Sequence, residues 1–188
     1  MTISINQITS GIALLINDEI YLVTDYNHVK PGKGSAFVRV KLKNVKSHQV
    51  LERTFKTAEK LQDAPLEERK LKNLYLSGDS YYFMDLTTFE EIVVPKSVIG
   101  DDIKFLQDDL EVSGIFYNND ILKVNLPIFI EAEITHTEPG FKGDSSKAGT
   151  KPATIDTDTV MQVPLFIEIG DKIKIDTRTG LYVERVKK

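Results

Sequence analysis

Residues 28–43, with the sequence HVKPGKGSAFVRVKLK, join a tight cationic turn to a strand in which apolar and basic residues alternate. Pro31 fixes one backbone dihedral, and the glycines on either side of Lys33 allow dihedrals that other residues avoid. Lys33 is therefore expected at the exposed tip of a hairpin. The alternation predicts a strand with one packed face and one cationic face. Its apolar positions are Val38, Val40 and Leu42, and its basic positions are Arg39, Lys41 and Lys43.

A lysine presented at such a tip is either a solvated turn residue or a side chain placed to reach a partner. The tip superficially resembles a phosphate-binding loop, but Asn27 stands where that motif begins with glycine. Gly34 also follows Lys33 where the motif requires Ser or Thr, and a strand follows instead of a helix. Nucleotide hydrolysis is therefore disfavoured.

The composition is that of a folded protein. At 188 residues and 41% hydrophobic content, the chain is long enough for one large domain or for two or three small ones. The sequence contains no apolar run long enough to cross a membrane, and residues 1–6 lack the features of a signal peptide. The absence of cysteine excludes disulfides, thiolate zinc sites and cysteine nucleophiles. We expect a soluble cytoplasmic protein without a membrane partner.

Charge is distributed unevenly along the chain. The net charge of −4 argues against a general nucleic-acid binder. Basic residues outnumber acidic ones by nine to six in residues 1–63, but the ratio is six to twelve in residues 64–127 and nine to ten in residues 128–188. This gradient indicates an oriented contact with a polyanion, with the acidic middle facing solvent, protein or a less charged groove. Chance variation between thirds of a chain is the alternative.

Short apolar runs separated by Gly, Asn and Asp turns follow one another almost throughout. Residues 17–19 (NDE) and 118–120 (NND) each separate two such runs and predict hairpins. The only substantial helical turns are expected within residues 103–110. The pattern predicts an all-β fold of three consecutive small β-barrels. We expect an SH3-like (KOW-like) barrel in residues 1–63, and OB-fold barrels in residues 64–127 and 128–188.

No constellation of catalytic or metal-ligating residues is apparent. The three histidines, His28, His48 and His136, lack the spacing of metal ligands. His28 either contacts phosphate beside the basic tip or is a polar strand residue. Adjacent carboxylates such as Asp101 and Asp102 point apart and indicate a solvated acidic face. We therefore predict neither catalytic residues nor a metal site.

A long loop is predicted for residues 138–152. Loops of this length are usually functional or disordered. Backbone N–H groups around Gly143 and Gly149, together with Lys142, Lys147 and Lys151, would suit a phosphate backbone. A mobile surface loop is the alternative.

Several spaced motifs occur in the order found in one family. They are VKPGKG at 29–34, RTFK at 53–56, FM at 83–84, TFE at 88–90, GFKGD at 140–144, KPAT at 151–154, VPLFI at 163–167 and GDKIKIDTR at 170–178. On these motifs the chain resembles bacterial elongation factor P over essentially its whole length. That family is related to the hypusine-containing archaeal and eukaryotic factor.

The resemblance implies three barrels in an L-shaped, tRNA-like arrangement and a role as a translation elongation factor, not an enzyme. Such a factor binds the 70S ribosome between the P and E sites, positions P-site peptidyl-tRNA and stimulates peptide-bond formation. It thereby relieves stalling at consecutive prolines, and it is expected to act as a monomer. The alternative is a generic OB-fold RNA-binding or RNA-chaperone module that acts off the ribosome. The thin pattern of exposed aromatics and the absence of tryptophan count against that alternative.

The resemblance also assigns site residues. Lys33 would reach the CCA end of peptidyl-tRNA and would be the substrate of a Lys33-modifying enzyme. A lysine at this position leaves β-lysylation, aminopentanol addition or no modification open, and no other cofactor is expected. Contacts with the tRNA acceptor arm are expected at Lys30, Pro31, Gly32, Gly34, Arg39, Lys41 and Lys43. RNA contacts of the C-terminal domain are expected at Lys142, Gly143, Asp144, Ser145 and Lys151, where Ser145 replaces the Thr common in the family.

Overall fold

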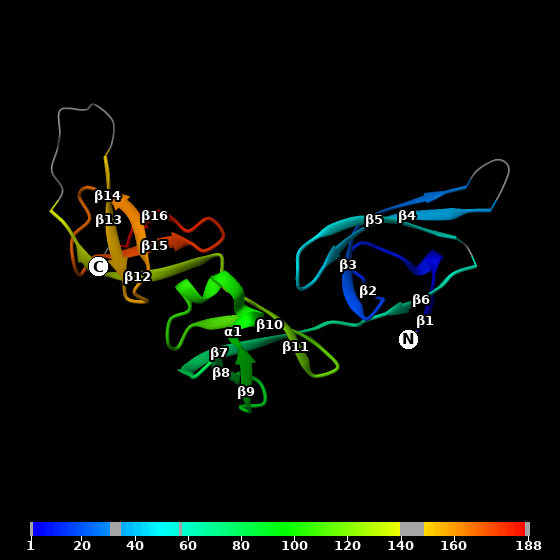
Figure 1. Ribbon diagram of the computed structural model, residues 1–188, viewed down its shortest axis with the longest axis horizontal. Coiled ribbons are helices and arrows are strands. Elements are labelled where there is room, and N and C mark those ends of the chain that lie inside the picture. Colours follow the sequence, from blue (N-terminus) through cyan, green and yellow to red (C-terminus); the bar gives the residue numbers. More distant parts are fainter. Residues whose placement is uncertain (1, 31–34, 57, 140–148, 187–188) are drawn as a thin grey trace. The chain divides into compact units, whose positions relative to one another are not determined.

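The computed structural model describes residues 2–30, 35–56, 58–139 and 149–186. Strands dominate these residues and form three sheets, so the predicted all-β fold is confirmed (Figure 1). Contacts divide the chain into two compact units, residues 1–68 with 114–123, and residues 69–113 with 124–188. The domain boundaries expected at 63/64 and 127/128 stay a prediction.

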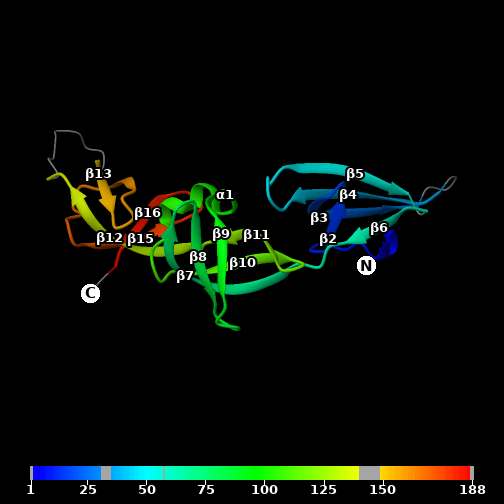
Figure 2. The same ribbon diagram turned by 60° about the horizontal axis from the view of Figure 1, so that its bottom comes forward.

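The first sheet has six strands in the order β1-β6-β2-β3-β4-β5. These are β1 (Thr2–Ser4), β2 (Ala13–Ile16), β3 (Glu19–Val29), β4 (Phe37–Asn44), β5 (Val50–Lys56) and β6 (Lys60–Asp63), with a short 3-10 helix at Ile5–Gln7. Figure 2 shows β2, β3, β4 and β5 curling as neighbours. The sheet closes around a core formed by Ile5, Ile8, Leu14, Val23, Val38, Val40, Leu42, Phe55 and Leu61.

Turn chemistry fixes the register of the first sheet. Asn17 and Asp18 both have positive φ, of 51° and 62°, and Ile16 pairs with Glu19. Two left-handed residues in a two-residue loop match the twist of paired strands, and Asn and Asp tolerate this conformation. The predicted hairpin at this position is therefore confirmed, with Glu19 already in the second strand.

The second sheet has the order β11-β10-β7-β8-β9. Its strands are β7 (Glu67–Ser77), β8 (Ser80–Asp85), β9 (Glu91–Pro95), β10 (Glu111–Tyr117) and β11 (Asp120–Asn125). The expected hairpin around residues 118–120 is present, because Asn118 and Asn119 join β10 to β11 with positive φ.

The helical turns of the middle segment begin earlier than predicted. They comprise α1 (Lys96–Ile99) and a 3-10 helix at Gly100–Phe105, instead of residues 103–110. Pro95 precedes the first helical residue, where a missing N–H costs nothing. Residues 109 and 110 cannot be helical because their backbones hydrogen-bond Asn73 of β7, at 3.0 and 2.9 Å. The prediction was therefore wrong in its bounds.

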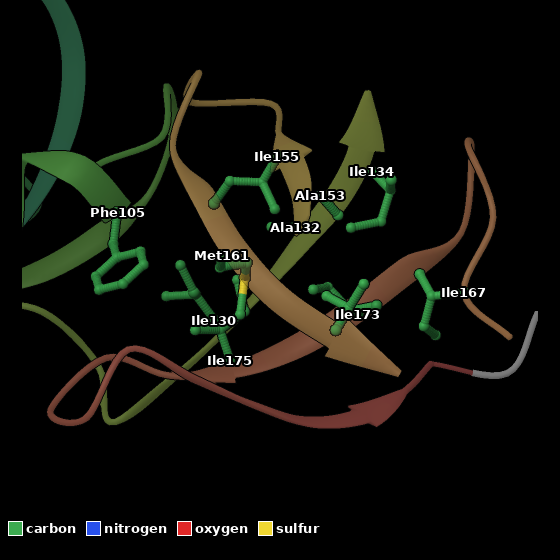
Figure 3. Packing of buried hydrophobic residues seen from close by; sticks show 11 residues of the cluster. Phe105, Ile130, Ala132, Ile134, Ala153, Ile155, Met161, Ile167, Ile173 and Ile175 are labelled. Atoms are coloured by element: carbon green, nitrogen blue, oxygen red, sulfur yellow. The ribbon is translucent and has the colours of Figure 1, made fainter. Parts of the chain in front are cut away.

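The third sheet has the order β14-β13-β12-β15-β16. Its strands are β12 (Phe129–Thr137), β13 (Thr150–Ile155), β14 (Val160–Pro164), β15 (Lys172–Asp176) and β16 (Leu181–Arg185). Phe105, at the end of the 3-10 helix, packs into the core of this sheet beside Ile130 and Ile175 (Figure 3). The expected loop of residues 138–152 ends earlier than predicted, because β13 begins at Thr150.

No helix among the described residues is long and apolar enough to cross a membrane.

Candidate nucleic-acid interface

The hairpin of β3 and β4 carries the predicted tip. Val29 at the end of β3 pairs with Phe37 at the start of β4, so residues 30–36 connect two paired strand ends (Figure 1). Lys30 and Ser35, on either side of the tip, are exposed. The expected tip residues Pro31, Gly32, Lys33 and Gly34 lie outside the described residues.

The outer face of β3, β4 and β5 can be followed from the register of the strands, because residues directly opposite one another share a face. The row nearest the tip contains Val29, Phe37 and Lys56, and the next row contains Asn27, Arg39 and Thr54. A third row contains Asp25, Lys41 and Glu52. The three rows differ in charge, and this difference determines which of them suits an anion.

The two rows nearest the tip surround an open depression of about 440 Å³ that is lined by Ser35, Phe37, Arg39, Thr54 and Lys56. Arg39 and Lys56 supply two cations, and two hydroxyl groups supply further donors for phosphate oxygens. The Arg39 guanidinium carbon lies 5.9 Å from the centre of the Phe37 ring, so the guanidinium is held beside an apolar surface. This depression has the chemistry of a phosphate–ribose site.

The third row is not cationic as a whole, because β3 and β5 add acidic residues to the lysine that β4 contributes. Lys41 pairs with Asp25 on one side and Glu52 on the other, and its Nζ lies 3.9 Å from the Glu52 carboxylate. Lys41 therefore forms an ion pair with Glu52 and lies directly opposite a second carboxylate residue, Asp25. A smaller depression of about 180 Å³ covers this part of the face, and Arg39 lines it together with Asp25, Lys41 and Glu52.

Lys43 lies still further from the tip. It pairs with Leu22 and Val50 and is half-buried, so its surroundings are apolar. Among the described residues expected to contact the acceptor arm, Arg39 therefore lies in the depression beside the tip, whereas Lys41 and Lys43 lie progressively further along β4. Sequence reasoning missed Lys56 as a site residue. The alternation of β5, read together with its pairing to β4, is the signal that would have found it.

His28 lies on the opposite face of β3 from Asn27, where its ring makes an edge-to-face contact with Tyr26 at 5.5 Å between ring centres. Within the described part of the chain, no three His, Cys, Asp or Glu side chains cluster as metal ligands would.

A second expected contact region lies between β12 and β13. Lys142, Gly143, Asp144 and Ser145 lie outside the described residues, but Lys151 is described. Its side chain is buried, with 7% exposed, and its Nζ donates a hydrogen bond of 2.7 Å to the backbone carbonyl of Glu138. The structure thus directs this ammonium at the chain's own backbone instead of outward.

Two side chains therefore join the strand ends from which the 140–148 segment departs. Besides the bond from Lys151, the Thr137 hydroxyl donates to the carbonyl of Pro152 at 2.9 Å. Gly149 allows a close approach at the same place, because a Cβ there would lie 2.9 Å from a methyl of Leu165. We call Thr137, Glu138, Lys151 and Pro152 the neck.

A turn after β15 is held by an ion pair. The Asp176 carboxylate accepts hydrogen bonds from Arg178 Nε at 3.0 Å and from its NH2 at 2.6 Å. These bonds lower the pKa of Asp176 and raise that of Arg178. Thr177, between them, donates from its hydroxyl to the carbonyl of Pro127 at 2.9 Å, so the turn also fixes the chain that enters β12.

Comparison with known proteins gives three family matches in sequence order. Residues 4–61 match a family described as "Elongation factor P (EF-P) KOW-like domain", residues 66–124 match "Elongation factor P (EF-P) OB domain", and residues 130–185 match "Elongation factor P, C-terminal".

Full-length relatives agree with these matches. Proteins named Elongation factor P from Thermoanaerobacter sp. (strain X514) and Persephonella marina are 48% and 50% identical. The first alignment covers 94% of this chain and 95% of the relative, and the second covers 98% and 97%.

Two solved structures share the fold. "Eukaryotic translation initiation factor 5A from Methanococcus jannaschii" is 26% identical with a TM-score of 0.52, over 66% of this chain and 93% of that one. "Translation initiation factor eif-5a family protein from Naegleria fowleri" is 14% identical with a TM-score of 0.55, over 67% and 98%, and this likeness concerns the fold alone.

Proposed function

The chain belongs to the elongation factor P family, and from this premise we propose that it binds the ribosome between the peptidyl-tRNA and exit sites and stimulates peptide-bond formation at consecutive prolines. The observation that carries the proposal is the match of three family models, in order, from residue 4 to residue 185. Membership of the family makes the chain a translation elongation factor. The ribosomal site and the effect on proline stalling are the parts we propose.

In this proposal the chain is not an enzyme, because the ribosome performs the chemistry and the factor supplies positioning. Holding reacting groups in a productive geometry lowers the entropic part of a barrier, and such effects can be worth several kcal/mol. Lys33 is the side chain that reaches the end of the peptidyl-tRNA. Pro31 fixes one backbone dihedral before Lys33, so less entropy is lost when Lys33 docks.

The depression beside the tip supports this proposal. Arg39 and Lys56 offer two cations to the acceptor-arm backbone, which fixes the register of the factor without reading sequence. Lys30 adds a third exposed cation at the end of β3. Lys41 contributes less than its charge implies, because Asp25 and Glu52 flank it.

At the other end of the chain, we propose that Lys142, Gly143, Asp144 and Ser145 contact RNA. Lys151 then acts on these residues as a positioning residue, through its bond to Glu138, instead of contacting phosphate itself. A buried ammonium that already donates to the backbone is poorly placed to neutralise a solvent-facing phosphate.

The modification state of Lys33 is open to direct measurement. Intact-mass spectrometry of the protein from its native host distinguishes unmodified Lys33 from β-lysylated Lys33 and from Lys33 carrying aminopentanol. Either extension implies a Lys33-modifying enzyme as a further partner.

The function is tested by complementation. A host that lacks its own factor expresses this chain, or Lys33→Ala, together with a reporter that contains three consecutive prolines. We expect the wild-type chain to restore reporter synthesis and Lys33→Ala to fold normally without restoring it. Normal synthesis with the alanine variant would contradict the role of Lys33. Filter binding to free RNA provides the second arm, since tight binding without ribosomes would favour a generic RNA-binding module.

A further inference from the structure

Phe89 has an unusual position in the turn between β8 and β9. Its φ is 60°, in the left-handed region that bulky residues avoid, and 73% of the residue is exposed. Gly, Asn and Asp are the residues that normally adopt a left-handed conformation. An exposed phenyl ring also contributes no hydrophobic stabilisation to the fold. Phe89 is thus unfavourable for the isolated chain in both respects, which is typical of a side chain held for a partner.

The turn that presents Phe89 is rigid. Asp85, with 1% exposed, accepts hydrogen bonds from the backbone N–H groups of Thr87 and Thr88 at 2.8 and 3.2 Å. The N–H of Phe89 donates to the carbonyl of Asp85 at 2.8 Å, and the N–H of Asp85 donates to Glu90 at 2.9 Å. A turn closed by four such bonds offers its aromatic side chain with little conformational entropy left to lose on binding.

The outer face of the same strands is apolar and aromatic. Tyr75 of β7, Tyr82 of β8 and Val93 of β9 form one row across neighbouring strands. The two tyrosine rings stack with centres 4.7 Å apart, and Tyr75 and Val93 are 46% and 50% exposed. An exposed tyrosine stacked on a half-buried one, on a sheet whose β8–β9 turn exposes a phenylalanine, resembles the aromatic centres of protein interfaces, which are rich in Tyr and Phe.

Two carboxylates adjoin Phe89, and Lys72, in the row between Phe89 and the tyrosines, is ion-paired with Asp109 at 2.6 Å. Glu90 and Glu91 directly follow Phe89, and the Tyr75 hydroxyl lies 3.2 Å from the Glu91 carboxylate. Partial desolvation and then Glu91 raise the pKa of Tyr75, so the phenol stays neutral. Carboxylates outnumber basic residues by twelve to six in residues 64–127. Such a surface repels a phosphate backbone and attracts Lys and Arg, whose cations also bind tyrosine faces.

We propose that Phe89, together with Tyr75, Tyr82 and Val93, forms a docking surface for a basic protein segment, with Phe89 as its anchor. The phenyl ring of Phe89 enters an apolar pocket of that segment. Lys or Arg side chains of the segment contact Glu90, Glu91 and the stacked tyrosines. This surface lies on other strands than the tip hairpin, so it is a contact additional to the one made by Lys33.

Photo-crosslinking on purified 70S ribosomes tests the proposal, and the choice of the ribosome rests on the proposed function. The photoreactive residue p-benzoylphenylalanine replaces Phe89, and crosslinked material is identified by mass spectrometry. We expect a crosslink to a ribosomal-protein peptide of net positive charge. A crosslink to ribosomal RNA, a crosslink to an acidic peptide, or a ribosome-bound chain without any protein crosslink would overturn the proposal. A wild-type chain that fails to sediment with ribosomes would overturn the proposed function and this inference with it.

Affinity measurements with three variants separate binding from folding. Glycine relieves the backbone strain at position 89, so Phe89→Gly should melt at the wild-type temperature or above it. We expect Phe89→Gly and Phe89→Ala to bind ribosomes at least about tenfold more weakly, the effect of removing an interface anchor, and Phe89→Tyr to remain within about twofold. Wild-type affinity of the well-folded glycine variant would refute the anchor role.

Discussion

Arg39 and Lys41 are neighbours on the outer face of β4, yet the structure predicts different effects when each is neutralised. Arg39 lies between Asn27 and Thr54 in the depression beside the tip, without a carboxylate in its row. Lys41 lies between two carboxylates, Asp25 and Glu52. The substitutions Arg39→Gln and Lys41→Gln therefore form a matched pair, in which the same charge is lost at the same kind of exposed strand position.

The magnitude follows from counterion release. A cation that neutralises one phosphate adds about 0.7 to 0.9 to the slope of log affinity against log salt concentration. Between roughly 50 and 200 mM salt, this amounts to about a threefold change in affinity for each contact. Loss of a charged hydrogen bond costs a further amount of about 1.5–3 kcal/mol at constant salt. Arg39→Gln should lose both the contribution to the salt slope and the charged hydrogen bond. Lys41→Gln should keep the wild-type salt slope, because carboxylates already offset the charge of Lys41.

The assay is equilibrium binding to ribosomes that carry peptidyl-tRNA in the P site, repeated over that salt range. Both variants should melt at the wild-type temperature, since both side chains are exposed. The reasoning would be refuted if Arg39→Gln kept the wild-type slope, or if Lys41→Gln flattened it as strongly as Arg39→Gln.

Three other predictions rest on particular contacts. Lys151→Met should weaken ribosome binding without changing the salt slope, because the ammonium donates a hydrogen bond to Glu138 and does not contact RNA. A slope lower by about 0.7 to 0.9 would contradict this and would indicate that Lys151 contacts a phosphate directly. The pKa of Asp176 is lowered by Arg178, so this pair stabilises the fold above the ordinary carboxyl pKa of 3.8 and the stabilisation is lost as pH falls through the lowered value. Urea unfolding should therefore depend less on pH below 3.8 in Asp176→Asn, and an unchanged pH dependence would contradict this. Phe55→Ala, at a side chain with 1% exposed, should cost about 3–5 kcal/mol of unfolding free energy, while Phe89→Ala should cost almost none; equal losses in denaturant titrations would refute the assignment of core and surface.

Features with a local physical cause were predictable from the sequence. The two Asn-containing turns fix their hairpins through backbone preferences of the turn residues themselves. The alternation in residues 37–43 likewise identified the buried face of β4, because a strand exposes every second residue. The all-β class follows from many such segments in succession.

Features that depend on distant partners were not predictable. The offset charge of Lys41 requires knowing that Asp25 and Glu52, from two other strands, pair with it. The burial of Lys151 depends on the position of Glu138 across the neck. The helical turns were misplaced because residues 109 and 110 bond to Asn73, some 36 residues earlier in the chain. In each case the interaction that decides the structure joins residues far apart in the sequence, so it cannot be predicted from composition or periodicity.

The central claim concerns the rate of one chemical step. In a purified translation system programmed with three consecutive proline codons, the rate of proline–proline bond formation is measured by rapid quenching, with and without this chain. We predict that the wild-type chain accelerates that step and that it leaves the rate on a proline-free template unchanged. Lys33→Ala should bind ribosomes and give no acceleration. An unchanged proline–proline rate with the wild-type chain, or full acceleration by Lys33→Ala, would contradict the claim that this protein acts by positioning peptidyl-tRNA through its tip.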